Sequence, residues 1–165
     1  MQELLKAFMR EAAQQVYAVT ARNGDRYAAL IATSVTSVSL SPPLMVVSIA
    51  RDSRNHPIIA SAEHFLISML GVGGERASTI LAEPGDGRTK LEAVGYRETE
   101  WGPIVTSSIG FLALRRHSVC AGGDHDLILG EVVGGEQPSG CPLVYHRRGY
   151  TTVRSCVADS LDGGR

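Results

Sequence analysis

The fold is decided largely by one stretch, Thr33-Ser34-Val35-Thr36-Ser37-Val38-Ser39-Leu40-Ser41-Pro42-Pro43-Leu44-Met45-Val46-Val47-Ser48. Six of the nine residues from Thr33 to Ser41 carry hydroxyl groups, and Pro42-Pro43 then leads into an apolar run. Hydroxyls and loop amides at this density can bind an anion or the polar edge of a ring. The same pattern also fits an exposed strand followed by a turn. The surrounding sequence has to decide between these two interpretations.

Length and charge limit the class of protein. With 165 residues the chain is long enough for one domain with a sizeable core. Its 16 basic and 17 acidic residues give a formal net charge of -1, so we expect no nucleic-acid partner. No apolar run approaches the length of a membrane span, and the first residues lack the pattern of a signal peptide, so we expect no membrane association.

The cysteines give a weaker indication. Cys120, Cys141 and Cys156 are odd in number and contain no Cys-x-x-Cys pair, which disfavours a zinc knuckle or a redox dithiol. Reduced thiols in a cytoplasmic protein are the simplest expectation.

Apolar patterning predicts a mainly β fold with a few short helices. An amphipathic helix is expected over 4–12, and shorter helices over 57–61 and 75–82. Asn23-Gly24 predicts a hairpin, because this dipeptide favours tight turns between strands. Strands are expected at 16–21, 27–33, 44–50, 65–70, 109–117, 126–133 and 144–153, which together suggest a β-barrel. Residues 83–88 read as a loop and 89–96 are ambiguous. We expect a single domain over 1–157 and a disordered tail over 158–165.

Most familiar catalytic patterns do not occur in the sequence. It contains no Gly-x-Ser-x-Gly, no Gly-x-Gly-x-x-Gly opening a helix and no Walker-type loop, so a serine hydrolase or a Rossmann-type enzyme is not expected. No spacing of His, Cys and carboxylates indicates a metal site.

A second patch is more informative. His125 lies between Asp124 and Asp126 at the start of an apolar run, where a carboxylate can fix its tautomer, although a polar strand-entry turn explains the same residues.

Together these motifs resemble the flavin reductase-like family, which has the FMN-binding split-barrel fold. The hydroxyl-rich segment resembles the family's signature. The other motifs that carry the resemblance follow in the family's order and are Phe65-Leu66-Ile67-Ser68-Met69-Leu70, Trp101-Gly102-Pro103-Ile104-Val105, Gly123-Asp124-His125 with Gly130-Glu131-Val132, and Pro142-Leu143-Val144-Tyr145 with Gly149-Tyr150. The resemblance covers residues 8–153, nearly the whole chain.

The resemblance implies a specific activity. Family members are homodimers that bind FMN or FAD, reduce it with NADH or NADPH, and in many cases release the reduced flavin to a separate monooxygenase. It implies that His125 lies on the nicotinamide side and that Asp124 orients it. By the same resemblance, the flavin-binding residues are Thr33, Ser34, Val35, Thr36, Ser48, Ile49, Ala50, Arg51, Ser53, Arg54, Asn55 and Ser68, with Tyr145 as a possible aromatic face; Arg51 and Arg54 would supply the positive charge for the phosphate.

Three positions depart from the family pattern. Val35 replaces a frequent aromatic residue, Ser41 an Asp and Ser68 an Asn, which puts the choice and affinity of the flavin in question more than the fold. Two other functions therefore stay open. One is a flavin carrier or storage protein without reductase turnover. The other is a split-barrel protein that oxidises its own bound substrate or binds another ligand such as haem.

Overall fold

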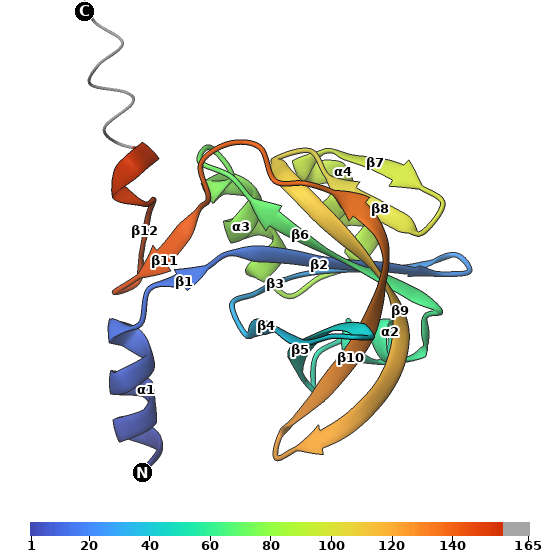
Figure 1. Ribbon diagram of the computed structural model, residues 1–165, viewed down its shortest axis with the longest axis horizontal. Helices are drawn as coiled ribbons and strands as arrows, with labels where there is room; N and C mark the ends of the chain where they lie inside the picture. The colour runs from blue at the N-terminus through green and yellow to red at the C-terminus, as the bar shows by residue number, and fades with distance from the viewer. Residues whose placement is uncertain (157–165) are drawn as a thin grey trace, which may run out of the picture.

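A seven-stranded antiparallel sheet forms the body of the protein in the computed structural model, which describes residues 1–156 (Figure 1). Its strands lie in the order β3-β2-β6-β9-β10-β5-β4. Their bounds are β2 Tyr17–Asn23, β3 Arg26–Ala32, β4 Val35–Leu40, β5 Pro43–Ala50, β6 His64–Leu70, β9 Ser108–Gly122 and β10 His125–Glu136. The predicted tail over 158–165 lies outside the described residues.

The other elements decorate this sheet. A three-stranded sheet has the order β1-β11-β12, and a two-stranded sheet joins β7 to β8. The bounds of these elements and of the helices are α1 Gln2–Glu11, β1 Gln14–Gln15, α2 His56–Ser61, α3 Glu75–Ala82, α4 Gly87–Val94, β7 Tyr96–Thr99, β8 Gly102–Val105, β11 Val144–His146 and β12 Gly149–Thr151.

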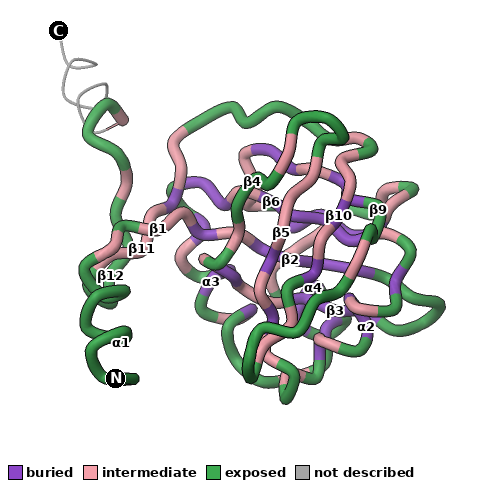
Figure 2. Tube along the Cα trace, turned by 60° about the horizontal axis from the view of Figure 1, so that its bottom comes forward, coloured by how far each residue is buried: buried purple, intermediate pink, exposed green. Residues whose placement is uncertain are grey.

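The large sheet curls around its own core. Ala28 of β3 and Val47 of β5 belong to one buried cluster, although four strands lie between β3 and β5 in the sheet order. Phe65, Leu114 and Ile128, all fully buried, belong to the same cluster. In Figure 2 the buried segments, in purple, gather along the strands of the large sheet. Within residues 1–156 no hydrogen-bonded strand pairing joins β3 to β5. Side-chain packing alone brings these two strands together, and the unpaired gap between them is the seam of the barrel. The predicted split barrel is confirmed.

A long hairpin carries the predicted Gly-Asp-His motif. β9 and β10 pair from Phe111↔Glu136 to Gly122↔His125 and turn at Gly123-Asp124. Gly123 has φ +77°, a conformation that favours glycine because it has no Cβ. The turn therefore places Asp124 and His125 at the tip of the hairpin, which projects at the lower edge of Figure 1.

Most predicted elements are confirmed, and two segments differ. The expected strand over 144–153 is instead the hairpin of β11 and β12, because Arg147 and Arg148 both adopt positive φ (49° and 64°) and reverse the chain. The segment around 89–96 contains α4, whose first turn is capped by Asp86 Oδ1 accepting a hydrogen bond from Thr89 N–H (2.9 Å). The residues predicted as a loop thus end in the first turn of a helix.

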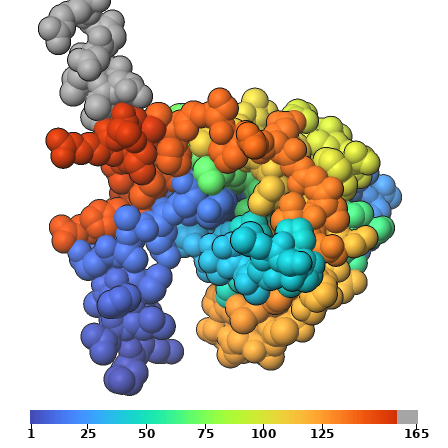
Figure 3. Space-filling view, viewed as in Figure 1, coloured from blue at the N-terminus to red at the C-terminus, as the bar shows by residue number. Residues whose placement is uncertain are grey.

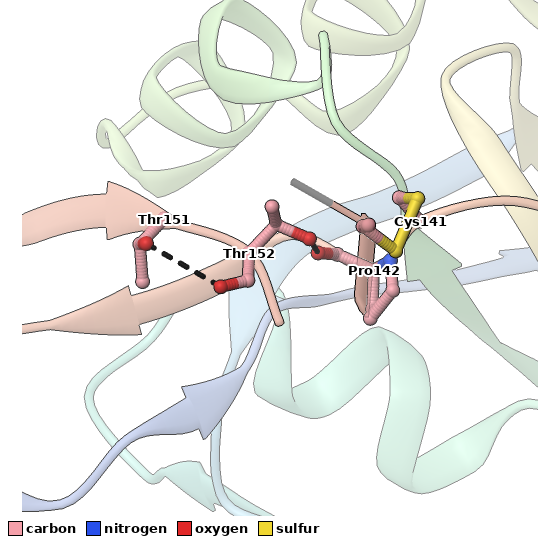
Figure 4. Close-up of a disulfide and its surroundings, with 5 residues drawn as sticks. Cys141, Pro142, Thr151 and Thr152 are labelled. Atoms are coloured by element: carbon pink, nitrogen blue, oxygen red, sulfur yellow. Dashed lines mark hydrogen bonds between the residues drawn. A yellow bond between two sulfur atoms is a disulfide. The ribbon is translucent and has the colours of Figure 1, made fainter. Parts of the chain in front are cut away.

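The expectation of reduced cysteines is wrong for two of the three. Cys141 and Cys156 form a disulfide, while Cys120 is free and exposed. Figure 4 shows this bond beside Thr152, whose Oγ1 donates to the Pro142 carbonyl oxygen at 2.8 Å. The pairing could not be read from spacing, because the hairpin of β11 and β12 brings the two cysteines together. It fastens the chain after β12 to the loop before β11.

Helix α1 stands away from the body (Figures 1 and 3). None of its residues is buried, and the exposed fractions of Leu4, Leu5 and Phe8 are 67%, 62% and 72%. It is held to β11–β12 by the Arg147 N–H donating to the Arg10 carbonyl and by an ion pair between Arg147 and Glu11. An amphipathic helix of this length thus leaves its apolar side uncovered in the single chain. Among residues 1–156, no helix is long and apolar enough to cross a membrane.

Candidate functional site

A cavity of about 520 Å³ lies along the seam of the barrel. One wall comes from β3 and the following residues, a second from β5 and the loop before α2, and a third from the end of α3 and the loop to α4. The predicted site residues that line it are Thr33, Ser34, Ser48, Ile49, Ala50, Ser53, Arg54, Asn55 and His125. The split of the barrel therefore brings together nine residues that are far apart in sequence.

The hydroxyl-rich wall is held by reciprocal hydrogen bonds. Ser48 N–H donates to the Ser34 carbonyl oxygen, and Ser34 Oγ donates to the Ser48 carbonyl oxygen, both at 3.1 Å. Val35 follows in register with Val47 and packs against the barrel core instead of lining the cavity. Thr36 is exposed and also lies outside the cavity lining. Of the four-residue signature, Thr33 and Ser34 thus offer polar groups to a ligand.

The loop before α2 forms the second wall. Asn55 is buried, and its Oδ1 accepts a hydrogen bond from Ala29 N–H at 3.0 Å, which ties this loop to β3. The carbonyl oxygen of Asn55 accepts hydrogen bonds from the N–H groups of Ile58 and Ile59, so Asn55 is the N-cap residue of α2. Arg54, next to it, is exposed and has no ion-pair partner in the part of the chain that the structure describes. Its guanidinium is available to an anion in the cavity.

Arg51 has a different environment from the one expected for a phosphate ligand. Its Nε donates to Asp126 Oδ1 at 2.7 Å, and Asp126 Oδ2 accepts a hydrogen bond from His56 Nε2 at 2.8 Å. The hydrogen bond from Arg51 has the largest effect on the pKa of the Asp126 carboxyl, and the hydrogen bond from His56 has a smaller one. Both hold this pKa below its ordinary value. Arg51 thus anchors the start of β10, and it does not line the cavity.

The tip of the long hairpin contributes His125 to the lining of the cavity. His125 Nδ1 lies 2.7 Å from Asp124 Oδ1, and this hydrogen bond lowers the pKa of the Asp124 carboxyl. The Arg51 N–H donates to the Asp124 carbonyl oxygen at 3.1 Å and ties the turn to the end of β5. With Nδ1 held by Asp124, the other ring nitrogen of His125 is left for a ligand.

Two predicted residues lie elsewhere in the single chain. Ser68, in the middle of β6, is fully buried, and its Oγ has no hydrogen-bond partner among the described residues. Tyr145, in β11, packs edge-on against Tyr150 with ring centroids 5.4 Å apart and lines a separate cavity beside α1. Their roles in flavin binding stay predictions.

Sequence reasoning missed several residues of the site. Leu81, Ala82, Glu83 and Lys90 form the third wall, and Asp52 lies at the second. Lys90 lies in the segment whose structure was ambiguous, and no periodic signal marks its burial. The hydrogen bond between His56 and Asp126, beside the site, was not foreseen because 70 residues separate the two in sequence. Within residues 1–156, no cluster of three or more His, Cys, Asp or Glu side chains could hold a metal ion.

Comparison with known proteins finds flavin reductases among the relatives of this chain. A reductase component of 4-hydroxyphenylacetate 3-monooxygenase from Thermus thermophilus is 34% identical over 153 residues, which cover 91% of this chain and 95% of that protein. An NADH-dependent flavin reductase from Kitasatospora aureofaciens is 33% identical over 140 residues, covering 78% of this chain and 68% of the relative. A probable flavin reductase from Rhizobium meliloti is 36% identical over 136 residues, but this match spans only 43% of that protein.

Solved structures show the same fold. The flavin reductase HpaC complexed with NADP+ superposes with a TM-score of 0.85 at 26% identity, covering 94% of this chain and 99% of that one. The NADH:FAD oxidoreductase SgcE6 of Streptomyces globisporus, in complex with NAD and FAD fragments, gives a TM-score of 0.83 at 25% identity, with 91% of each chain covered. The family model described as the flavin reductase like domain matches residues 9–154. The chain therefore belongs to the flavin reductase-like family.

Proposed function

We propose that the protein is an NAD(P)H:flavin oxidoreductase that reduces FMN or FAD and supplies the reduced flavin to a partner monooxygenase. One observation carries the proposal: the hydroxyl-rich wall, Arg54 and His125 line a single cavity in the split of the barrel. The activities of the Thermus and Kitasatospora relatives support it. The partner enzyme is inferred from relatives that are reductase components of monooxygenases.

The cavity fits a flavin in size and in chemistry. Its volume of about 520 Å³ lies in the range of pockets that hold cofactor-sized ligands. Ile31, Ile49 and Leu81 offer apolar surface for a ring system, whereas Thr33, Ser34 and backbone amides offer hydrogen bonds for its polar edge. Arg54 supplies a positive charge for a phosphate.

The side chains of the site bind and orient rather than react. When both cofactors are bound, a hydride passes from C4 of the nicotinamide to N5 of the flavin. Hydroxyls and amides of the wall stabilise the negative charge that develops on the ring. His125, held by Asp124, positions the nicotinamide against the flavin, because alignment of the two rings lowers the barrier to hydride transfer.

A flavoprotein that keeps its flavin, or a flavin carrier, is the second candidate. Val35 favours release over retention, because its side chain packs into the barrel core and covers no part of the cavity. Oxidation of NADH and of NADPH is to be measured with trace protein and added FMN or FAD. If the protein is a reductase, each molecule oxidises many equivalents of the nucleotide, and this oxidation requires added flavin. If the protein is a carrier, neither NADH nor NADPH is oxidised.

A homodimer is proposed from the unpartnered side of α1. A helix of ten residues is marginal in water by itself, so its apolar side needs a cover. An apolar hollow of about 360 Å³ on the barrel is lined by Tyr17, Met45, Met69 and Phe111 with their neighbours, and it offers the second copy a surface of the matching kind. We propose that α1 of each copy packs on the other.

Phe8→Glu is expected to weaken this dimer at least about 100-fold, because it places a charge where an apolar side chain is buried. Sedimentation at decreasing protein concentration measures the effect. Glu3→Lys changes charge on the opposite side of the same helix and serves as the control. If Phe8→Glu and Glu3→Lys dissociate at the same concentration as the unchanged protein, α1 does not form the interface.

A cytoplasmic location is proposed from the reductant. NADH and NADPH are cytoplasmic metabolites. The cysteines do not support this location, because Cys141 and Cys156 form a disulfide and disulfides are rare in that compartment.

A further inference from the structure

The residues on either side of His125 are both bonded to Arg51. The Arg51 N–H donates to the Asp124 carbonyl oxygen at 3.1 Å, and the Arg51 Nε donates to Asp126 Oδ1 at 2.7 Å. Arg51 directly follows β5, whose last residue, Ala50, is in register with His125. The backbone that carries the His125 ring is therefore held on both sides to the end of the neighbouring strand.

Asp126 has a second bond, which leads to α2. His56 Nε2 lies 2.8 Å from Asp126 Oδ2, and because the lowered pKa of Asp126 keeps its carboxyl ionised, the ring nitrogen is the donor. His56 is the first residue of α2 and follows its N-cap residue Asn55, which lines the cavity. One carboxylate thus joins the strand of His125 to the loop that forms the second wall.

This carboxylate lies where solvent screens its bonds only in part. The exposed fractions of the Asp126 and His56 side chains are 16% and 17%, although the Arg51 side chain is half-exposed. The bond from Arg51 to Asp126 is also charge-assisted, which makes it stronger than a neutral hydrogen bond. The ion pair of Arg115 with Glu131, farther along the same hairpin, is more exposed and contributes less.

These bonds do what the bond between Asp124 and His125 cannot do. Asp124 and His125 are adjacent, so the hydrogen bond between them fixes the ring relative to the hairpin turn. The bonds from Arg51 and His56 to the strand fix that turn relative to the walls of the cavity. Both kinds of bond are needed to hold the ring in one place beside a bound cofactor.

We propose that Asp126 is a positioning residue for the nicotinamide, which sets the place of His125 relative to the flavin and leaves flavin binding itself unchanged. This inference rests on the proposed function, because it takes His125 as the residue that aligns the nicotinamide. Asp126 does not line the cavity, so its effect passes through residues that do. The second wall keeps a tie of its own when Asp126 is removed, because Asn55 Oδ1 accepts a hydrogen bond from Ala29 N–H at 3.0 Å.

The test is a double-mutant cycle of Asp126→Ala with His125→Ala, in which kcat/KM for NADH is measured with saturating FMN. Asp126→Ala alone is expected to lower kcat/KM about 10-fold, since a small displacement of an aligning group costs rate steeply. In the His125→Ala background the same substitution is expected to lower kcat/KM less than about twofold, because no ring remains to be positioned. The dissociation constant of FMN is expected to change less than about threefold in each variant.

A residue that only stabilises the fold acts whether or not His125 is present. Equal losses from Asp126→Ala in the two backgrounds would therefore overturn the inference, as would an unchanged kcat/KM or a matching loss of FMN affinity in Asp126→Ala alone. In each of these cases the unchanged protein still reduces flavin, and the proposed function stands. If the unchanged protein oxidises neither NADH nor NADPH with added flavin, the proposed function fails and the inference fails with it.

Glu131→Ala is the matched control. Glu131 also lies on β10 and accepts a hydrogen bond from Arg115 at 2.8 Å, but it does not line the cavity, and its partner belongs to β9. Its kcat/KM for NADH is expected to equal that of the unchanged protein. A loss as large as that of Asp126→Ala would contradict the inference, because any ion pair on the hairpin would then have the same effect.

Asp126→Asn covers the case in which Asp126→Ala does not fold. Asparagine keeps the volume of the side chain and can accept the hydrogen bond from Arg51, but it carries no charge. We expect a loss of about threefold in kcat/KM in the otherwise unchanged protein and none in the His125→Ala background. The same loss in both backgrounds would contradict the inference.

Discussion

Replacing His125 with alanine is expected to lower kcat/KM for NADH about 100-fold while the dissociation constant of the flavin changes less than about threefold. His125 lines the cavity, and its Nδ1 is held by Asp124 at 2.7 Å. A nicotinamide that loses this contact is no longer aligned with the flavin, and misalignment of about 1 Å can cost a factor of this size. Steady-state kinetics and flavin binding measure the two effects separately.

His117→Ala is the matched control for this variant. His117 is also exposed and lies on the same long hairpin, but it does not line the cavity. Its kinetics are expected to equal those of the unchanged protein. Unaltered use of NADH by His125→Ala would show that the hairpin tip has no part in binding the nicotinamide.

Gly87→Ala is expected to lower the free energy of unfolding by about 3 kcal/mol. Gly87 begins α4 where the helix packs on β3, and an added Cβ would lie 2.2 Å from the Tyr27 carbonyl oxygen and 2.6 Å from its carbon. Both are backbone atoms of a buried strand, so they cannot move aside as a flexible side chain would. The helix must shift, and with it Lys90 at the cavity wall.

Gly85→Ala is the control, since a Cβ there meets only the aliphatic carbons of Lys90, at 3.7 and 3.8 Å. Its effect on unfolding is expected to stay within about 0.5 kcal/mol. Denaturant unfolding of the two variants gives the comparison. Equal stability would mean that α4 does not pack closely on β3.

The sequence alone predicts the local structure well where a single physical pattern dominates. Alternating apolar residues predict β2, and a short apolar run predicts β6. Asn23-Gly24 predicts the hairpin of β2 with β3, and Pro57 marks the first turn of α2. The hairpin of β11 and β12 was missed because its turn is made by Arg147 and Arg148, which rarely adopt positive φ. Such a turn depends on tertiary contacts and leaves no mark in composition.

The site was predicted in part, for a related reason. Thr33, Ser34 and His125 were found because they belong to motifs that are contiguous in sequence, and the resemblance to a family placed them together. The burial of Lys90 depends on the end of α3, and the bond of Arg51 to Asp126 spans 75 residues. Positive charge was therefore expected at Arg51, where a carboxylate already neutralises it, and not at Lys90.

One measurement tests the central claim most directly. Without oxygen, NADH is added to a trace of protein with FMN in large excess, and the absorbance of both compounds is followed. Reductase activity with release of the flavin predicts that FMN is reduced one for one with NADH until NADH is exhausted, far beyond one flavin per subunit. Reduction that stops at one flavin per subunit, or fails to begin with either NADH or NADPH, would contradict the account.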